Sequence, residues 1–392
     1  MTHPTRILAP LLGAALAAAP AAHAQAPPQT QTDDYTRYEL QAPESAAFRI
    51  LYDVSATTPG ARYYYNTIRA GAEEEVHGVT DLHTGAPLSW EVVDGGYARE
   101  HGHPRASPGG RYIQVALARP VPQGGQGRIR IDKTYWDEAS YFTVDGDIVF
   151  QRSLGIRRNA VVLPPGYEVV AANYPVQLGT EADGRIRVSF MNPGPGAVDF
   201  ELRGRPLPGG PRPAPATPPR ESVPTSGAGS PTRARVGWTF AERAFQDRDI
   251  TYHLLDPNSH SFRLFHDYTE TRPGMDRYLN VVRAGSRASD PEAWNLDTGE
   301  RLQVEQLKGP QITARGIDLG SAPGPDTEVV VVWFDPVESG ASTRIRIWET
   351  YTDPGRYLLA GEELVWDRGF GRPRNTVILP EGWFLSANAV PG

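Results

Sequence analysis

The residues best suited to hold a metal ion lie in one short stretch of the chain. His101 and His103 would point to the same face of an extended segment, and His77, His83 and Glu100 lie nearby in the sequence. A zinc site needs three or four such ligands that converge on one point. The Gly- and Pro-rich residues that follow are typical of a solvated loop, and the second half of the chain has no matching histidines. We therefore predict no metal site.

The tripeptide Asp297-Thr298-Gly299 has the sequence of an aspartic-protease motif. That chemistry requires two carboxyl groups that share a proton. The corresponding tripeptide in the first half of the chain is His83-Thr84-Gly85, so a second aspartate is missing. The flanking apolar runs instead predict a hairpin turn at both places.

Other catalytic signatures are missing from the sequence. There is no cysteine, which excludes disulfides, thiolate metal ligands and cysteine nucleophiles. There is also no zinc-peptidase helix motif, serine nucleophile elbow, phosphate loop or dinucleotide-binding glycine pattern. We predict no catalytic, cofactor-binding or metal-binding residue in this chain. Whether the protein is an enzyme stays open, and the sequence favours a non-catalytic role.

Aromatic side chains are the remaining candidates for ligand contact. Neighbouring aromatics on a strand must divide between its two faces, so some of them point outward. Such residues could form a sugar- or peptide-binding face, although in sandwiches aromatic clusters usually lie in the core. The candidates are Tyr63, Tyr65, Trp136, Tyr141, Tyr357 and Trp366.

An internal repeat organises the chain. Tyr38-Glu-Leu-Gln-Ala-Pro43 matches Tyr252-His-Leu-Leu-Asp-Pro257, and further matches continue at a constant offset of 214 residues. From Arg128-Ile-Arg-Ile131, which matches Arg344-Ile-Arg-Ile347, the offset is 216. Ordered matches over more than half of each copy predict two homologous domains.

Both copies have the periodicity of β-strands. Arg128 to Tyr135 and Arg185 to Phe190 alternate polar and apolar residues, and Gly, Pro, Asn and Asp punctuate such runs at short spacing. No helical stripe of ten or more residues is present. The predicted fold is all-β, with two homologous antiparallel β-sandwich domains in tandem joined by a Pro-rich linker. The predicted boundaries are a signal peptide at 1–24, a disordered leader at 25–34, copy one at 35–205, a Pro/Gly/Ser-rich linker at 206–236 and copy two at 237–392.

The first residues predict export. Arg6 precedes a short apolar run from Ile7 to Ala19, and Ala22-His23-Ala24 matches the small-x-small pattern of signal-peptide cleavage. The run is too short to span a bilayer, and no later stretch predicts a transmembrane helix. We expect a periplasmic or extracellular protein. Its formal net charge of −7 also argues against binding to nucleic acid.

The second copy ends early relative to the first. Copy one continues through residues 183–190 and 198–202, which we interpret as a closing hairpin, whereas copy two ends at Gly392, opposite residues 174–176. A sandwich without this hairpin would expose a strand edge. We expect that the native chain continues, that another polypeptide donates the strands, or that copy two closes differently.

Two functions fit these features best. The first is an exported non-catalytic binding or accessory module for an envelope polysaccharide or protein, in which linked copies could gain avidity. The second is the N-terminal, non-catalytic region of a longer exported hydrolase whose catalytic domain follows residue 392. The strand-rich layout with Leu-Pro-x-Gly-aromatic turns, at Leu163 and Leu379, is similar in layout to the N-terminal β domains of some secreted zinc peptidases. A third alternative is a structural protein that assembles by strand exchange at the exposed strand edge.

Overall fold

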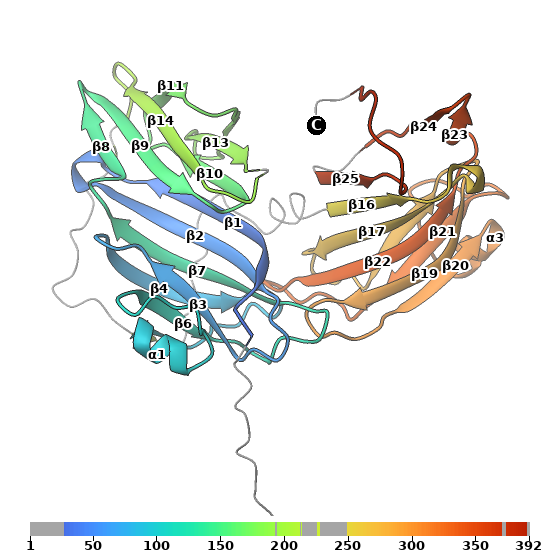
Figure 1. Ribbon diagram of the computed structural model, residues 1–392, viewed down its shortest axis with the longest axis horizontal. Helices are drawn as coiled ribbons and strands as arrows, with labels where there is room; N and C mark the ends of the chain where they lie inside the picture. The colour runs from blue at the N-terminus through green and yellow to red at the C-terminus, as the bar shows by residue number, and fades with distance from the viewer. Residues whose placement is uncertain are drawn as a thin grey trace, which may run out of the picture.

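The computed structural model describes residues 27–192, 194–211, 213, 226–227, 249–370 and 374–389. The predicted signal peptide, most of the predicted linker and the first residues of predicted copy two lie outside these residues. Within the described residues, no helix combines the length and apolar character needed to cross a membrane. The two copies form two β-rich bodies that meet along one side (Figure 1).

Copy one is built on a seven-stranded sheet. Its strands are, in spatial order, β12 (Gln177–Thr180), β13 (Ile186–Met191), β10 (Arg158–Val162), β1 (Gln31–Leu40), β2 (Ala47–Ala56), β7 (Gly127–Trp136) and β4 (Glu73–Asp81). All neighbours are antiparallel except β1 and β10, which run parallel.

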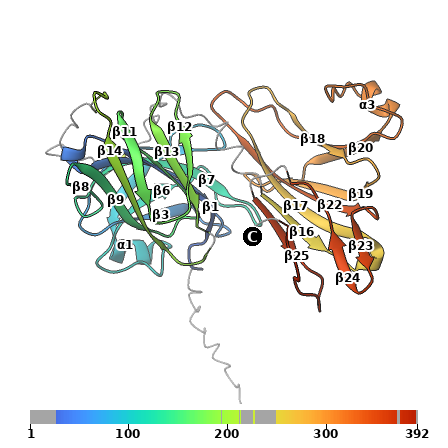
Figure 2. The ribbon, with the colours of Figure 1, turned by 90° about the horizontal axis from the view of Figure 1, so that it is seen from above.

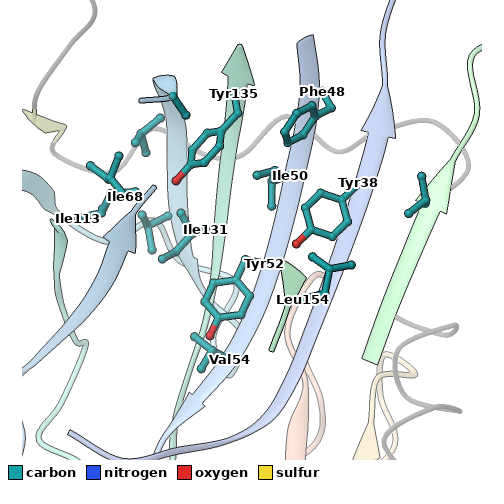
Figure 3. Packing of buried hydrophobic residues seen from close by; sticks show 14 of the residues in the cluster. Tyr38, Phe48, Ile50, Tyr52, Val54, Ile68, Ile113, Ile131, Tyr135 and Leu154 are labelled. Atoms are coloured by element: carbon teal, nitrogen blue, oxygen red, sulfur yellow. The ribbon is translucent and has the colours of Figure 1, made fainter. Parts of the chain in front are cut away.

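Two four-stranded sheets pack on one face of this large sheet. The first contains β11 (Tyr167–Ala172), β14 (Val198–Pro206), β9 (Asp147–Leu154) and β8 (Tyr141–Val144). The second contains β15 (Ser226–Gly227), β5 (Trp90–Asp94), β6 (Arg111–Ala116) and β3 (Tyr63–Ile68). A short helix, α1 (Gly95–Glu100), follows β5, and a 3-10 turn, η1 (Pro43–Ser45), joins β1 to β2. Side chains from all three sheets share one apolar core, part of which is shown in Figure 3.

Copy two repeats this plan. Its main sheet has the order β25 (Arg374–Ile378), β16 (Asp249–Leu254), β17 (Ser261–Glu270), β22 (Thr343–Thr352) and β19 (Arg287–Asn295), with β16 and β25 parallel. The remaining elements are β18 (Arg277–Val282), β21 (Glu328–Trp333), β20 (Gln303–Lys308), β23 (Tyr357–Ala360), β24 (Glu363–Trp366), η2 (Pro257–Ser259) and α3 (Pro310–Ala314). Figure 2 shows the two main sheets side by side when the molecule is seen from above. The predicted all-β fold with two homologous domains is confirmed.

Period-two burial explains why these segments form sheets. In β17, Phe262, Leu264 and His266 are buried, whereas Arg263 is exposed and Phe265 is half-buried. Apolar side chains on one face therefore pack against the second layer, and polar or amphipathic side chains occupy the other.

Three details differ from the sequence predictions. Strand β1 begins at Gln31, inside the predicted leader at 25–34, because Gln31 and Thr32 pair with the end of β2. Residues 226–227, inside the predicted linker, form β15 and pair with β5. The predicted closing hairpin is wrong, because β13 pairs with β10 in the large sheet whereas β14 pairs with β9 and β11 in the other layer. An apolar strand in each layer buries more core surface than a hairpin in one layer would.

Candidate functional site

Two of the predicted aromatic candidates are core residues. Tyr141 and Tyr357 are equivalent in the repeat, and both side chains are fully buried. Each hydroxyl donates a hydrogen bond to a backbone carbonyl, that of Gln41 in copy one and that of Leu255 in copy two. This bond satisfies the polar end of a buried tyrosine, so the pair stabilises each sandwich at the same place.

The candidates at β3 and β7 lie in different environments. Tyr63 is exposed, whereas Tyr65, two residues later, is buried and donates a hydrogen bond of 2.6 Å to the carbonyl of His101. Trp136 is half-buried at the end of β7. These three side chains do not form a shared surface. Whether any of them contacts a ligand stays a prediction.

The histidines around α1 pack against tyrosines. The ring of His103 stacks on Tyr65 with 5.5 Å between centroids, and the ring of His101 stacks on Tyr97 at 3.8 Å. Burial lowers the pKa of His103. In the part of the chain that the structure describes, no three His, Asp or Glu side chains are grouped so that they could hold a metal ion.

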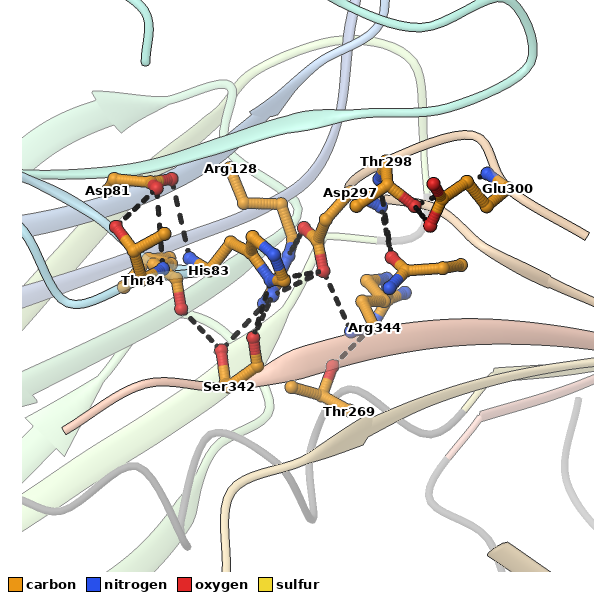
Figure 4. A network of polar contacts seen from close by, with 12 residues as sticks. Asp81, His83, Thr84, Arg128, Thr269, Asp297, Thr298, Glu300, Ser342 and Arg344 are labelled. Carbon is orange, nitrogen blue, oxygen red and sulfur yellow. Dashed lines mark hydrogen bonds and ion pairs between the residues drawn. The ribbon is translucent and has the colours of Figure 1, made fainter. Parts of the chain in front are cut away.

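The Asp297 tripeptide lies at the contact between the copies (Figure 4). Asp297 follows β19, is buried, and accepts two hydrogen bonds from the guanidinium of Arg128 on β7, at 2.5 and 2.9 Å. It also accepts a bond of 2.9 Å from the backbone N–H of Arg344. The Nδ1 atom of His83 lies 3.3 Å from its second oxygen. The carboxylate of one copy is thus bound by the cation of the other.

This charged cluster sets the protonation of both partners. Burial raises the pKa of Asp297, but the charge of Arg128 and the hydrogen bonds from His83 and Arg128 outweigh burial, so the pKa is well below its usual range. Burial lowers the pKa of His83, but Asp297 outweighs it and raises this pKa above the ordinary value. Protonated His83 therefore strengthens the contact, and its contribution is lost as the pH rises through the raised pKa.

The contact between the copies is reciprocal. The N–H of Gln126 in copy one donates to the carbonyl of Leu296 at 2.6 Å, and the hydroxyl of Ser342 in copy two donates to the carbonyl of Leu82 at 2.5 Å. Gln126 corresponds to Ser342, and Leu82 corresponds to Leu296, in the repeat. The turn after β4 thus binds the segment that precedes β22, and the turn after β19 binds the segment that precedes β7.

Backbones approach closely at this contact. Gly85 has a φ of 74°, and a Cβ atom there would lie 2.5 Å from the carbonyl oxygen of Gly340. The turn after β4 therefore requires glycine for its conformation and also for the approach of the second copy. The two hydrogen-bonded turns and the buried ion pair hold the copies in one relative orientation.

The largest difference between the copies is at β25. The side chains of Val161 and Val162 on β10 are fully buried, with 0% exposure each. Their equivalents on β25, Val377 and Ile378, are 40% and 43% exposed. Strand β13 pairs with the far edge of β10, and no described residue pairs with the far edge of β25. Apolar residues that copy one buries are therefore open to solvent in copy two.

The second layer shows the same difference. Strand β11 pairs only with β14 in copy one, and the equivalent residues in copy two, 383–388, form no strand. Phe384 and Leu385 there are 84% and 66% exposed. Val365 on β24 and Phe370 are also exposed, whereas their equivalents Val149 and Leu154 are buried. We call this area of copy two the open face, defined by Val365, Phe370, Val377, Ile378, Phe384 and Leu385.

The predicted candidate Trp366 borders the open face. It is half-buried, and its ring packs on Tyr252 and Phe262 at 5.0 and 5.7 Å between centroids. Its copy-one equivalent, Phe150, is completely buried. Sequence reasoning therefore identified one aromatic residue beside the open face and an exposed strand edge in copy two, but did not name the exposed apolar residues themselves.

A buried carboxyl group in copy two was also missed. Glu349 on β22 is buried, and one of its oxygens accepts a bond of 2.6 Å from the Asn280 amide. The other oxygen, Oε1, has no hydrogen-bond donor among the described residues. Burial raises the pKa of Glu349 to about 7. Lys133 takes the equivalent place in copy one and donates to the amide oxygen of Asn66.

Comparisons with known proteins give structural similarity only. No family model matches the chain, and no curated protein sequence matches it. Among solved structures, an M1 zinc metallopeptidase from Deinococcus radiodurans is 13% identical over 46% of this chain and 42% of that chain, with a TM-score of 0.32. An aminopeptidase N family protein from Idiomarina loihiensis is 10% identical, over 44% of this chain and 29% of that chain, with a TM-score of 0.25.

A collagen adhesin from S. aureus is similar over more of the chain. It is 10% identical over 90% of this chain and 92% of that chain, with a TM-score of 0.18. This chain covers less than half of the length of the peptidases that it matches. These similarities concern β-rich domains.

Proposed function

We propose that this chain is an exported binding module and that an extended apolar segment, from this chain beyond residue 392 or from another polypeptide, covers the open face of its second copy. The observation that carries the proposal is the exposure of Val377 and Ile378, whose equivalents in copy one are fully buried. An unpaired strand edge beside exposed apolar side chains is the arrangement used in binding by strand addition. Copy one is closed and supports copy two through the Asp297 contact.

Copy one indicates the chemistry of the captured segment. Strand β13 runs antiparallel to β10 and inserts Val188 and Phe190 into the core. Strand β14 adds Phe200 and Leu202 from the other layer. A segment that fills the same places in copy two would carry apolar residues at alternate positions. Each fully buried side chain of this kind contributes about 1.5–3 kcal/mol.

Charge adds a second requirement. The Nε atom of Arg205 on β14 lies 3.6 Å from the carboxylate of Asp147 on β9. The equivalent of Asp147 in copy two is Glu363, which is exposed at the start of β24. The captured segment should therefore carry an arginine or lysine that faces Glu363.

A peptide with the sequence of residues 184–206 tests the proposal, because it contains both covering strands of copy one. The intact chain should bind a fluorescently labelled copy of this peptide, as measured by anisotropy. A peptide in which Val188 and Phe200 are replaced by aspartate should not bind.

Two variants locate the binding site. The double variant Val377→Asp and Ile378→Asp should bind the peptide at least tenfold more weakly, whereas Leu178→Asp should bind it as the unchanged chain does. Leu178 is a matched control, because it is an exposed apolar residue on β12, the edge strand of copy one. Equal binding by both variants would refute the open face as the site.

Export is a separate part of the proposal and rests on the sequence of residues 1–24. Expression of the whole chain in a Gram-negative bacterium should release a periplasmic protein that starts at Gln25. Recovery of the uncleaved chain from the cytoplasm would contradict this part and leave the peptide experiment unaffected.

A further inference from the structure

A row of aromatic rings crosses the outer face of the main sheet of copy two, opposite to its core. Phe265 on β17 and Trp348 on β22 lie side by side, with ring centroids 4.1 Å apart. His253 on β16 extends the row at 5.0 Å from Phe265, and Trp294 on β19 extends it at 5.8 Å from Trp348. All four side chains are half-buried, so part of each is open to solvent.

The row is specific to copy two. The equivalent residues in copy one are Glu39, Leu51, Thr80 and Asp132. In copy one, Asp132 forms an ion pair with Arg49. In copy two, tryptophan replaces this aspartate, and Arg263, the equivalent of Arg49, lies over the Trp348 ring at 5.6 Å from its centroid. Arg263 is exposed and has no carboxylate partner among the described residues.

The aromatic row forms part of a cavity between the copies. A cavity of about 240 Å³ is lined by Phe265, Trp348, Thr251, Asp249 and the ion pair of Asp267 with Arg346, together with Thr32 and Gln126 of copy one. Its carboxylates can accept hydrogen bonds from sugar hydroxyls, whereas Arg263 lies outside this lining, over the Trp348 ring. This volume is below the about 300–1,000 Å³ of typical small-molecule pockets. The cavity therefore suits one unit of a longer chain that extends along the sheet.

From these features we infer that the cavity and its aromatic row bind an acidic oligosaccharide. The C–H face of a sugar ring packs on an aromatic ring, and hydroxyl groups would find donors and acceptors in Thr251, Gln126 and Asp267. A uronate carboxylate would bind the free guanidinium of Arg263, which forms charge-assisted and bidentate hydrogen bonds. Arg263 thus selects the acidic sugar over a neutral one.

Calorimetric titration of the intact chain with trigalacturonic acid and with maltotriose tests this inference. The chain should bind the acidic trisaccharide more tightly, and added salt should weaken that binding. The variant Arg263→Gln should bind the acidic sugar about tenfold more weakly and bind maltotriose within twofold of the unchanged chain. Arg203→Gln is the control, because Arg203 is an exposed arginine on β14 of copy one.

A second variant tests the aromatic platform. Trp348→Ala should weaken the binding of both sugars, and the thermal unfolding of the variant shows whether it is folded. Arg263 is exposed, so Arg263→Gln decides the inference even if Trp348→Ala does not fold. Unchanged affinity of Arg263→Gln for the acidic sugar, or absence of binding of either sugar by the intact chain, would overturn the inference. The single variant Val377→Asp should keep its sugar affinity, since Val377 pairs with the core residue Tyr252, on the face opposite to the aromatic row, and does not line the cavity.

Discussion

The two copies share a strand order but differ in how much of their cores is covered. In copy one, β13 and β14 cover both layers, and one cluster of buried residues joins all three sheets. In copy two, the described core is divided into separate clusters, and the positions equivalent to Val161 and Val162 are open. Among the described residues, the same plan therefore gives a closed sandwich in copy one and a partly uncovered sandwich in copy two.

The main sheet has the same topology in both copies, with and without described covering strands. The parallel pairing of β10 with β1 is repeated by β25 with β16, although no described strand covers the far edge of β25. In copy one, the covering strands β13 and β14 contribute buried residues to the core. In copy two, no described strand covers the corresponding surface.

The largest effect should come from truncating equivalent core aromatics. Phe150→Ala in copy one removes a completely buried side chain and should cost about 3–5 kcal/mol of unfolding free energy. Trp366→Ala, at the equivalent half-buried position, should cost about half as much because solvent already reaches this site. Urea unfolding of each variant measures both values. Equal losses of unfolding free energy would contradict the difference in burial between the two positions.

The next effect concerns the contact between the copies. Asp297→Ala leaves the Arg128 guanidinium buried without its carboxylate and should destabilise the protein by about 3 kcal/mol. Small-angle scattering should then show a wider distribution of distances between the copies. Asp183→Ala is the control, because Asp183 pairs with Arg185 at the surface, where an ion pair contributes about 0–1 kcal/mol. Scattering profiles that match for all three proteins would contradict a rigid contact.

The third effect is a pH dependence that arises from Glu349 of copy two, whose place in copy one is taken by Lys133. Because burial raises the pKa of Glu349 to about 7, the folded protein holds a proton that the unfolded chain releases near pH 4.5. Stability should therefore fall as the pH rises from about 4.5 to about 7, and this contribution should level off above that pH. Glu349→Gln should remove this slope and stabilise the protein by about 1 kcal/mol at pH 8. An unchanged slope in chemical unfolding measured from pH 4 to pH 8 would exclude Glu349 as its source.

The smallest effect is expected at the exposed segment after β25. Replacing Phe384 and Leu385 by serine should change the unfolding free energy by less than about 0.5 kcal/mol, because both side chains are mostly exposed. The same variant should bind the peptide 184–206 more weakly. A large loss of stability would mean that these side chains are covered in solution.

The architecture could be predicted from the sequence because the chain contains two copies of the same domain. Matches such as Arg128 to Ile131 with Arg344 to Ile347 identify the same strand in both copies, and alternation identifies the inward face. The placement of β13 and β14 was not predictable, because alternation shows that a segment is a strand but does not show which sheet it joins. The equivalent tripeptides that begin at His83 and Asp297 predicted turns. They could not predict that Arg128 of copy one binds Asp297 of copy two.

The candidate binding residues were only partly predictable for a similar reason. The sequence shows that Trp366 is aromatic. Its exposed fraction depends on which strands cover it, and the residues around Trp366 do not show this. Phe265 and Trp348 lie 83 residues apart in the sequence, since the pairing of β17 with β22 brings positions 265 and 348 together. A row across a sheet is made of residues from four separate strands, and sequence spacing carries no sign of it.

The reciprocal hydrogen bonds between the copies have the form of an interface in a symmetric homodimer, in which each subunit offers the same patch to the other. The charged residues break that symmetry. Copy two holds both Asp297 and Arg344, whereas copy one holds Arg128 but has His83 at the position of the aspartate. Two first copies would place arginine opposite histidine, without a carboxylate to join them. The single substitution between Asp297 and His83 therefore disfavours the pairing of two first copies, and the tether of one polypeptide supplies a second copy at high effective concentration.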